Sequence, residues 1–275
     1  MHKHQISVVI PTYNRPLYLC ELIESLLRQT LQPMEIIIVN DGGESVEFVR
    51  ALYPELFITV INPDPKPHHV MARNLGIQAA SGSHILLCDD DDLLLPLHME
   101  ESMKVMEKEG ADFIHTDAEM VEFKVENGCR VPVNRRLFAY DYSLEDMRTF
   151  STFIPSGTIY RREIHEQIGY LDPAMNNYWD WDFFLRVCEK YKVRKLPMAT
   201  VLYAYGHSSN SAIHTKMRIY LDKLCTKHNL KPLPTNNFTS LLLEPGLQAR
   251  ASQSLRTWDG KPIRSRNKRG TDLDS

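Results

Sequence analysis

Short apolar runs alternate with stretches of helical periodicity through residues 6–88, and this alternation restricts the possible folds more than any other feature. The apolar runs are residues 6–10, 35–39, 57–61 and 84–88, and the helical stretches between them include residues 17–27 and 70–80. Strands without polar alternation must be covered on both faces, which is typical of a parallel sheet between helices. We therefore predict an α/β fold with a mostly parallel central sheet flanked by helices, Rossmann-like in this first half.

The pattern changes after residue 110. Residues 117–142 lack helical periodicity, and the segments that follow again alternate between extended and helical patterns. The expected strands are residues 111–115, 155–160 and 193–205, and the expected helices are residues 178–191 and 211–228. We predict that residues 1–110 and 111–230 are two halves of one domain, the second of mixed structure.

The composition is that of an ordinary globular protein. The 275 residues carry a net charge of -3, which argues against a basic nucleic-acid-binding protein. The five cysteines are odd in number and no two form a CxxC pair, so free thiols in a reducing compartment are expected. No apolar stretch approaches the length of a membrane span. We predict a cytoplasmic protein without a nucleic-acid partner.

The last segment, residues 231–275, is polar and weakly periodic. Seven basic residues and three acidic residues lie within residues 247–275. This composition predicts a solvated, flexible, basic tail. Its charge is also compatible with a peripheral contact to an anionic membrane or to another polyanion.

Four consecutive acids, residues 89–92, follow the expected strand 84–88. Open α/β sheets bind their ligands beyond the carboxyl ends of the strands. Oxygen ligands in this position suit a hard cation such as Mg²⁺ or Mn²⁺, which uses one or two carboxylates together with substrate phosphates. The alternative is a solvated acidic turn before a helix that starts near Pro96.

Polar residues also follow the first two expected strands, as Pro-Thr-Tyr-Asn-Arg at residues 11–15 and Asn-Asp-Gly-Gly at residues 40–43. Asp41 could accept hydrogen bonds from a nucleobase or a ribose, and Arg73 could contact a base or a diphosphate. The alternatives are a turn or helix cap for Asp41 and a surface salt bridge for Arg73. Because these strand ends share one rim of the sheet, we predict a ligand site there.

The segment Trp179-Asp180-Trp181-Asp182 lies at the start of the expected helix 178–191. Carboxylates two positions apart point to nearly opposite sides of a helix, so they should not share one role. Asp180 lies between two tryptophans, and desolvation there would raise its pKa toward the range of a general base. Asp182 has Arg186 four residues later and is expected on an exposed, ion-paired face. Tyr178 and the two tryptophans suit either stacking on a ligand or core packing.

Several histidines are ambiguous. His207 follows the expected strand 193–205 and could ligate a metal, contact a phosphate or simply cap the strand. His68 and His69, in a proline-rich loop, share this ambiguity. No HExxH, GxSxG or P-loop pattern is present.

Taken together and in this order, the motifs resemble those of the family 2 glycosyltransferases, which have the GT-A fold. The matching segments are SVVIPTYNR at residues 7–15, IVNDG at 38–42, ARNLG at 72–76, SGSHILLCDDDD at 81–92, IGYLD at 168–172 and WDWD at 179–182. The resemblance covers about residues 5–210.

The resemblance implies that residues 1–110 bind a nucleoside diphosphate sugar, with a UDP-sugar favoured, and that residues 111–230 bind the acceptor. It implies metal-dependent transfer to an acceptor hydroxyl with inversion, with Asp180 as the base and Mn²⁺ or Mg²⁺ as the cofactor. Asp91 and His207 would hold the metal, and Trp179, Trp181 and Asp182 would contact a glycan, lipid-linked or small-molecule acceptor. The donor-binding residues would be Pro11, Thr12, Tyr13, Arg15, Asp41, Arg73, Asp89 and Asp90.

Two features depart from the family's pattern. The loop before Ala72 is rich in proline instead of glycine, and Trp179 replaces the acid that usually precedes Asp180. Three other classes also stay open: a nucleotidyltransferase, a non-catalytic nucleotide-sugar or glycan-binding module, and a phosphoryl-transfer hydrolase with an aspartate nucleophile. The missing glycine-rich, lysine-bearing phosphate loop argues against the first, and the intact acids argue against the second.

Overall fold

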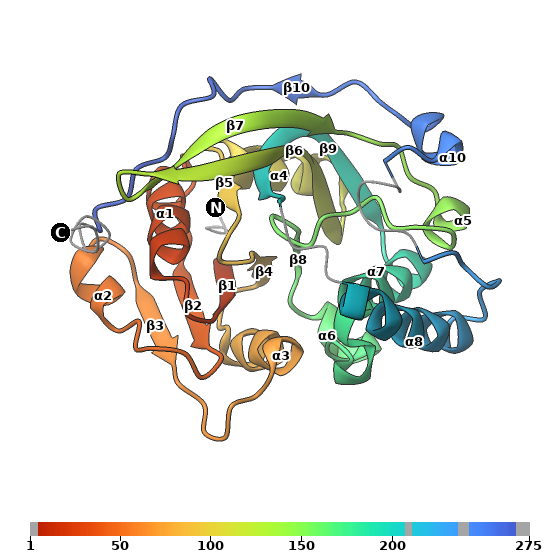
Figure 1. The fold of residues 1–275 in the computed structure, drawn as a ribbon, viewed down its shortest axis with the longest axis horizontal. Coiled ribbons are helices and arrows are strands. Elements are labelled where there is room, and N and C mark those ends of the chain that lie inside the picture. Colours follow the sequence, from red (N-terminus) through yellow and green to blue (C-terminus); the bar gives the residue numbers. More distant parts are fainter. Residues whose placement is uncertain (1–4, 207–210, 236–241, 268–275) are drawn as a thin grey trace.

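One ten-stranded sheet runs through the computed structural model, which describes residues 5–206, 211–235 and 242–267. The strand order is β10-β9-β6-β8-β4-β1-β2-β3, with β5 beside β9 and β7 beside β6. Helices flank the sheet (Figure 1), so the predicted α/β architecture is confirmed. None of the helices in these ranges is long and apolar enough to cross a membrane.

The first half of the chain forms the parallel part of the sheet. Its strands are β1 (Ile6–Thr12), β2 (Glu35–Asn40), β3 (Ile58–Ile61) and β4 (His84–Leu87), and its helices are α1 (Pro16–Leu27), α2 (Phe48–Leu52) and α3 (His69–Ala79). The strands β4, β1, β2 and β3 are parallel neighbours. Every residue of β1 and β2 is buried, which explains why both strands have almost continuous apolar sequences.

The chain after β4 extends the same sheet in mixed orientation. Its elements are β5 (Leu93–Leu94), α4 (His98–Glu109), β6 (Phe113–Glu126), β7 (Cys129–Phe138), α5 (Leu144–Met147), β8 (Ile159–Arg161), α6 (Ile164–Ile168), the 3-10 helix η1 (Pro173–Tyr178), α7 (Trp179–Lys190), β9 (Val193–Ala204) and α8 (Ser211–Lys227). Strand β8 is antiparallel to both β4 and β6 and therefore joins the two halves into one sheet.

The stretch without helical periodicity, residues 117–142, is largely a long hairpin of β6 and β7. Its two-residue turn is Asn127-Gly128, and both residues have positive φ, at 49° and 67°. This is the turn geometry that matches the twist of a β-hairpin and that an Asn-Gly pair adopts at low cost. The turn residues thus explain where the chain reverses.

The C-terminal segment is packed, in contrast to the flexible tail expected from its composition. It contains α10 (Pro245–Gln248) and β10 (Leu255–Arg256), which pairs with β9. Residues 250–267, here called the C-terminal strap, run from α10 across the β6–β7 side of the molecule toward α2 (Figure 1). Ile263 in the strap is buried in the main core.

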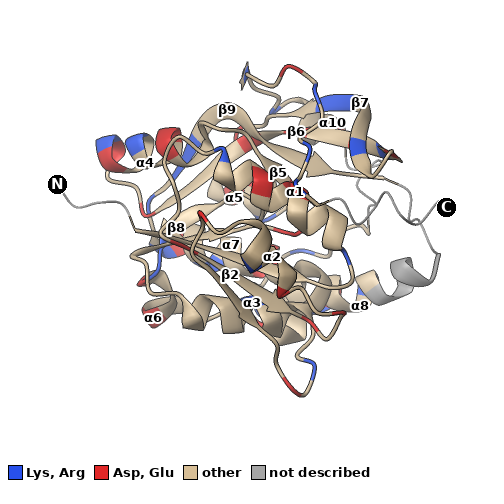
Figure 2. Cartoon of the chain, turned by 90° about the vertical axis from the view of Figure 1, so that its left-hand side faces the viewer, with Lys and Arg blue, Asp and Glu red and all other residues tan. Residues whose placement is uncertain are grey.

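The strap's basic residues explain this packing. Arg256 pairs with the buried carboxylate of Glu119 at 2.7 Å, and Arg266 pairs with Glu55 at 2.8 Å. The expected flexible tail is therefore wrong for these residues, because their charges are balanced within the chain. Elsewhere on the surface, acidic and basic residues are interspersed along α4 (Figure 2), where Lys104 lies 2.9 Å from Glu100.

Candidate active site

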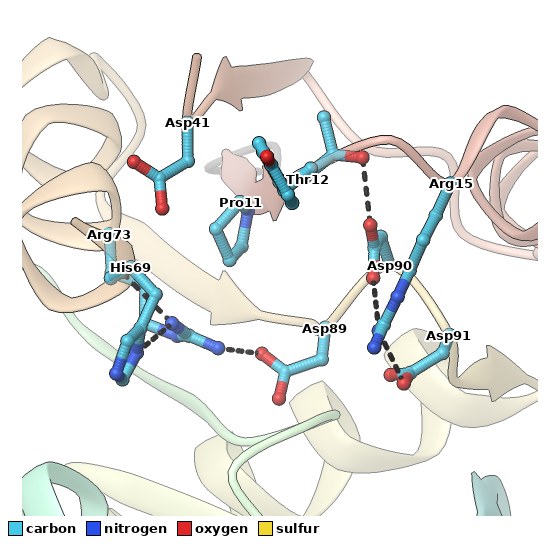
Figure 3. Close-up of a pocket in the computed structure, with 10 residues that line it drawn as sticks. Pro11, Thr12, Arg15, Asp41, His69, Arg73, Asp89, Asp90 and Asp91 are labelled. Carbon is cyan, nitrogen blue, oxygen red and sulfur yellow. Dashed lines mark hydrogen bonds and ion pairs between the residues drawn. The ribbon is translucent and has the colours of Figure 1, made fainter. Parts of the chain in front are cut away.

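A pocket of about 240 Å³ opens at the carboxyl ends of β1, β2 and β4 (Figure 3). We call it the rim pocket, and it is lined by Pro11, Thr12, Tyr13, Arg15, Asp41, His69, Arg73, Asp89, Asp90 and Asp91. All eight residues predicted to bind the donor are among them, together with Asp91. Parallel strands end on the same edge of a sheet, and this geometry gathers residues that are far apart in the sequence.

Three carboxylates of the rim pocket face two arginines (Figure 3). The Arg15 guanidinium lies 3.1 Å from a carboxylate oxygen of Asp90 and 2.6 Å from one of Asp91. Arg73 forms an ion pair with Asp89. Asp90 also accepts a hydrogen bond of 2.7 Å from the Thr12 hydroxyl. The pocket therefore offers guanidinium groups as well as carboxylates to a ligand.

The two arginines balance only part of the negative charge of the three carboxylates Asp89, Asp90 and Asp91. Burial raises the pKa of Asp90 to about 6, against the lowering effects of Thr12 and Arg15. Burial and the neighbouring Asp89 raise the pKa of Asp91. Carboxyl groups whose charged form is disfavoured by burial and by one another gain stability from an added cation.

The carboxylate oxygens of the rim pocket could bind a hard divalent cation as a partial set of ligands. Within the described ranges, no group of three His, Cys, Asp or Glu side chains is arranged to hold a metal. Mg²⁺ and similar ions commonly take only one or two protein carboxylates, and substrate phosphates and water complete the shell. The carboxylate oxygens of Asp89 and Asp91 suit this kind of binding, in which the protein supplies only part of the ligands around the metal ion.

The fourth acid, Asp92, has a different role from its neighbours. It is fully buried, and one carboxylate oxygen accepts a hydrogen bond of 2.8 Å from the backbone N–H of Ala204 at the end of β9. Asp92 thus fixes the acidic segment to β9 and lies outside the rim pocket.

Asp41 faces the opposite side of the rim pocket from Asp91. One of its carboxylate oxygens accepts a hydrogen bond of 2.9 Å from the backbone N–H of His68. The contact ties the proline-rich loop to the end of β2 and orients the carboxylate. Both interpretations of Asp41 from the sequence, a turn-stabilising acid and a pocket residue, are therefore compatible with its position.

Arg73 is buried, so the alternative of a surface salt bridge is wrong. It lies on α3, which packs closely on β1 because Gly76 has no side chain: a Cβ there would lie 2.5 Å from a methyl carbon of Val9. His69, one turn earlier, holds the guanidinium at 3.1 Å through its Nδ1. The sequence marked His69 only as ambiguous, and the structure places it in the rim pocket.

Arg73 also connects the rim pocket to α7. Its guanidinium lies 4.4 Å from the ring centre of Trp179, the first residue of that helix. Trp179 is buried, so it contacts this arginine and the core. The contact brings the start of α7, with Asp180, next to the acidic segment.

Asp180 lies in the first turn of α7, and one carboxylate oxygen accepts a hydrogen bond of 2.8 Å from the backbone N–H of Trp181. Burial, and less strongly the charge of Asp89, raise the pKa of Asp180 to about 6. A carboxylate with this pKa is a stronger base than an ordinary aspartate and is still ionised near neutral pH.

The sequence predicted that Asp182 lies on an exposed face of the helix and contacts the acceptor, but it is buried and lines neither pocket. It is fully buried and pairs with Arg186 at 2.9 Å, Lys227 at 2.7 Å and His228 at 2.8 Å. Burial alone would raise its pKa, but the hydrogen bond from His228 and the charge of Arg186 lower it to about 2. The structure therefore contradicts an acceptor contact by Asp182 and assigns it the role of fixing α8 to α7.

A second, larger cavity of about 610 Å³ begins at Asp180. We call it the aromatic cavity because six of its lining residues are aromatic. The lining residues are Phe138, Thr149, Phe150, Ser151, Phe153, Ile154, Pro155, Asn177, Tyr178, Asp180, Trp181, Tyr203, Met217, Leu221, Leu233, Pro234 and Glu244. Of these residues, the sequence predicted Asp180 as the base and Tyr178 and Trp181 as possible stacking residues, and no local pattern indicated the others. His207, the predicted second metal ligand, lies outside the described residues.

Comparison with known proteins identifies the class of this α/β protein as a transferase of sugar groups. The model of Glycosyl transferase family 2 matches residues 7–169. The uncharacterized glycosyltransferase YwdF of Bacillus subtilis (strain 168) is 54% identical over 265 residues, which are 95% of this chain and 98% of YwdF. The chain belongs to glycosyl transferase family 2.

More distant proteins are also similar in sequence or in fold. An uncharacterized glycosyltransferase of Haemophilus influenzae is 28% identical over 76% of this chain and 71% of its own length. The crystal structure of S. aureus TarS 1-349 in complex with UDP-GlcNAc matches with a TM-score of 0.63 at 17% identity, over 81% of this chain and 66% of that chain. The complex of TarS 1-349 with UDP matches with a TM-score of 0.60 at 19% identity, over 80% of this chain and 65% of that chain. The predicted GT-A type fold is confirmed.

Proposed function

We propose that this glycosyltransferase moves a sugar from a nucleoside diphosphate sugar, preferably a UDP-sugar, to an acceptor hydroxyl with inversion. The observation that carries the proposal is that the two sites lie next to each other, linked by the contact of Arg73 with Trp179 beside Asp180. Asp180 lines the aromatic cavity, and its neighbours Arg73 and Asp89 line the rim pocket. A donor and an acceptor bound in these two spaces would meet at Asp180.

The rim pocket supplies the groups that a nucleoside diphosphate requires. The guanidinium groups of Arg15 and Arg73 suit the diphosphate, because planar N–H donors match phosphate oxygens. Tyr13, whose ring is half exposed, offers a stacking surface for the base, and Asp41 offers an acceptor for base or ribose donors. TarS has been crystallised with UDP and with UDP-GlcNAc, which supports a UDP-sugar donor for this related fold.

Asp89 and Asp91 are the residues that would hold Mn²⁺ or Mg²⁺, with His207 as a further expected ligand. When bound, such an ion supplies Lewis-acid stabilisation of the charge on the leaving diphosphate. Arg15 lies between Asp90 and Asp91 and is therefore placed to contact the same phosphates.

The chemical step assigned to this chain is proton removal at Asp180. Its carboxylate accepts the proton of the attacking hydroxyl while the new oxygen–carbon bond forms at the anomeric centre and the bond to the diphosphate breaks. Attack from the face opposite the leaving group inverts that centre. The pKa of about 6 leaves the carboxylate ionised at neutral pH.

The test combines binding and turnover. A thermal-shift panel of UDP, dTDP, GDP, CDP and ATP, with and without Mn²⁺ or Mg²⁺, identifies the nucleotide. A ligand at 100 times its dissociation constant stabilises the fold by roughly 2.7 kcal/mol. We expect one diphosphate to act only with metal and Asp91→Ala to lose the effect. Asp180→Asn should keep the shift and abolish transfer. A response to triphosphates alone would favour a nucleotidyltransferase instead.

A further inference from the structure

The aromatic cavity has a chemical character that restricts the acceptor. Its volume of about 610 Å³ lies within the range of about 300–1,000 Å³ that is typical of pockets for small organic ligands. Among the described residues that line it, none is Lys, Arg or His, and the charged ones are Asp180 and Glu244. A phosphorylated or otherwise polyanionic group would therefore meet two carboxylates and, among the described lining residues, no positively charged side chain.

Most polar groups in the wall are already engaged within the protein. The indole N–H of Trp181 donates to the backbone oxygen of Met147 at 2.7 Å. The hydroxyl of Thr149 donates to the backbone oxygen of Asp146 at 2.7 Å. A ligand thus meets the faces of these side chains more than their hydrogen-bonding groups. Burial of apolar surface is then the main source of affinity.

The wall is also held in place by aromatic contacts behind it. Phe153 stacks on His115 with ring centres 3.8 Å apart and meets Phe184 edge-on at 5.3 Å. Tyr178 and Trp181 meet edge-on at 6.0 Å. Side chains fixed in this way do not have to be ordered when a ligand binds, which lowers the entropic cost of binding.

We infer that the acceptor carries a neutral apolar group beside its reacting hydroxyl, and that this group occupies the aromatic cavity while the hydroxyl lies at Asp180. The inference rests on the proposed function, since it takes the cavity to be the acceptor side of the reaction. An alkyl chain and an aryl ring share the required chemistry, and the choice of probes distinguishes them.

The experiment measures dissociation constants by isothermal titration calorimetry on the full chain. The probes are methyl, hexyl and phenyl β-D-glucopyranoside, with hexyl phosphate as the anionic probe. Each methylene that becomes buried strengthens binding about fourfold. We expect hexyl glucoside to bind at least tenfold more tightly than methyl glucoside and than hexyl phosphate. Tight binding of phenyl glucoside instead of hexyl glucoside would identify an aryl group.

Two substitutions on α8 give a matched pair. Met217→Trp adds volume on the cavity side, where Leu221 lies one turn later on the same face. Ile219→Trp adds an indole at a position that is 54% exposed and outside the cavity. We expect Met217→Trp to weaken binding of the apolar glucosides tenfold or more and Ile219→Trp to leave it unchanged. Leu233→Trp, at another lining residue, replaces Met217→Trp if that variant does not fold.

The outcomes separate this inference from the proposed function. Equal binding of all the glucosides, tighter binding of hexyl phosphate, or unchanged glucoside binding by the folded cavity-filling variant would overturn the inference. Nucleoside diphosphate binding is measured in parallel and depends on the rim pocket. If an apolar glucoside binds but no nucleotide does, the proposed function fails and the cavity's specificity stands; the reverse result rejects the inference alone.

Discussion

Replacing Arg130 with alanine is expected to cost a large part of the folding free energy. Arg130 on β7 and Glu21 on α1 form an ion pair in which each side chain is only 1% exposed. The backbone N–H of Arg130 donates to one Glu21 carboxylate oxygen at 2.9 Å and its Nε donates to the other at 2.5 Å. The Arg130→Ala variant would keep the backbone hydrogen bond but leave the buried Glu21 carboxylate without its cationic partner, at a cost of about 3–5 kcal/mol.

The same guanidinium holds the backbone of the acidic segment. Nη1 of Arg130 donates to the carbonyl oxygen of Asp91 at 2.5 Å. Replacing the pair by Glu21→Leu and Arg130→Met removes both buried charges, so the double variant should regain most of the stability. It cannot restore the hydrogen bond to Asp91. We therefore expect its metal-dependent stabilisation by nucleotide to stay below that of the wild type.

Urea denaturation followed by circular dichroism measures both effects, with unfolding free energies taken by linear extrapolation. Lys104→Ala is the control, because it removes an ion pair on the surface of α4 and should leave the midpoint unchanged. A decrease in the free energy of unfolding of less than about 1 kcal/mol for Arg130→Ala would refute this prediction, since a buried carboxylate without its cation destabilises the fold by more than that. A double variant with a normal nucleotide response would show that the contact to Asp91 is dispensable.

Three further predictions follow from the pKa values and the strap. Because Asp180 must be ionised to act as the base, the transfer rate should fall about tenfold per pH unit below pH ~6. Initial rates that stay constant between about pH 5 and 7 would show that Asp180 is not the base. Asp182 has a folded pKa of about 2 and an unfolded pKa of about 3.9, so the stability that its charge contributes is present above pH ~4 and is lost as the pH falls through about 2. Asp182→Asn should therefore lower the free energy of unfolding by about 2–3 kcal/mol at pH ~7, measured by urea titration. A loss that does not shrink toward about pH 2 would contradict this. Removing residues 255–275 should lower the melting temperature by at least about 4 °C by calorimetry, because Ile263 is buried, whereas a solvated tail could be removed without effect.

The parallel half of the fold and its rim could be predicted from the sequence for the same physical reason. Strands covered on both faces have uninterrupted apolar sequences, and β1 and β2 lie close to where those sequences placed them. Parallel strands also end on one edge, so the sequence predicts that Thr12, Asp41 and Asp89 lie together, and all three line the rim pocket.

Contacts between distant segments could not be predicted. Asp182 looked exposed because its local partner, Arg186, is typical of a solvated helix face, but Lys227 and His228 from the end of α8 bury it. Likewise, the aromatic cavity draws residues from segments between 138 and 244, and no periodicity relates them. The Asn127-Gly128 turn, by contrast, carries a local hairpin signal, because this pair favours a two-residue turn between strands.

The C-terminal strap has a consequence for the order in which the chain can fold during synthesis. Arg266 reaches Glu55 across 211 positions of sequence, and its backbone N–H donates to the hydroxyl of Tyr53 at 3.4 Å. At a translation rate of about 5–20 residues per second, the ribosome needs about 10–40 s to make the intervening chain. Until then the surface around α2 that the strap covers stays open. The part of the N-terminal half around α2 is therefore synthesised early but is fully packed only after the strap has been made.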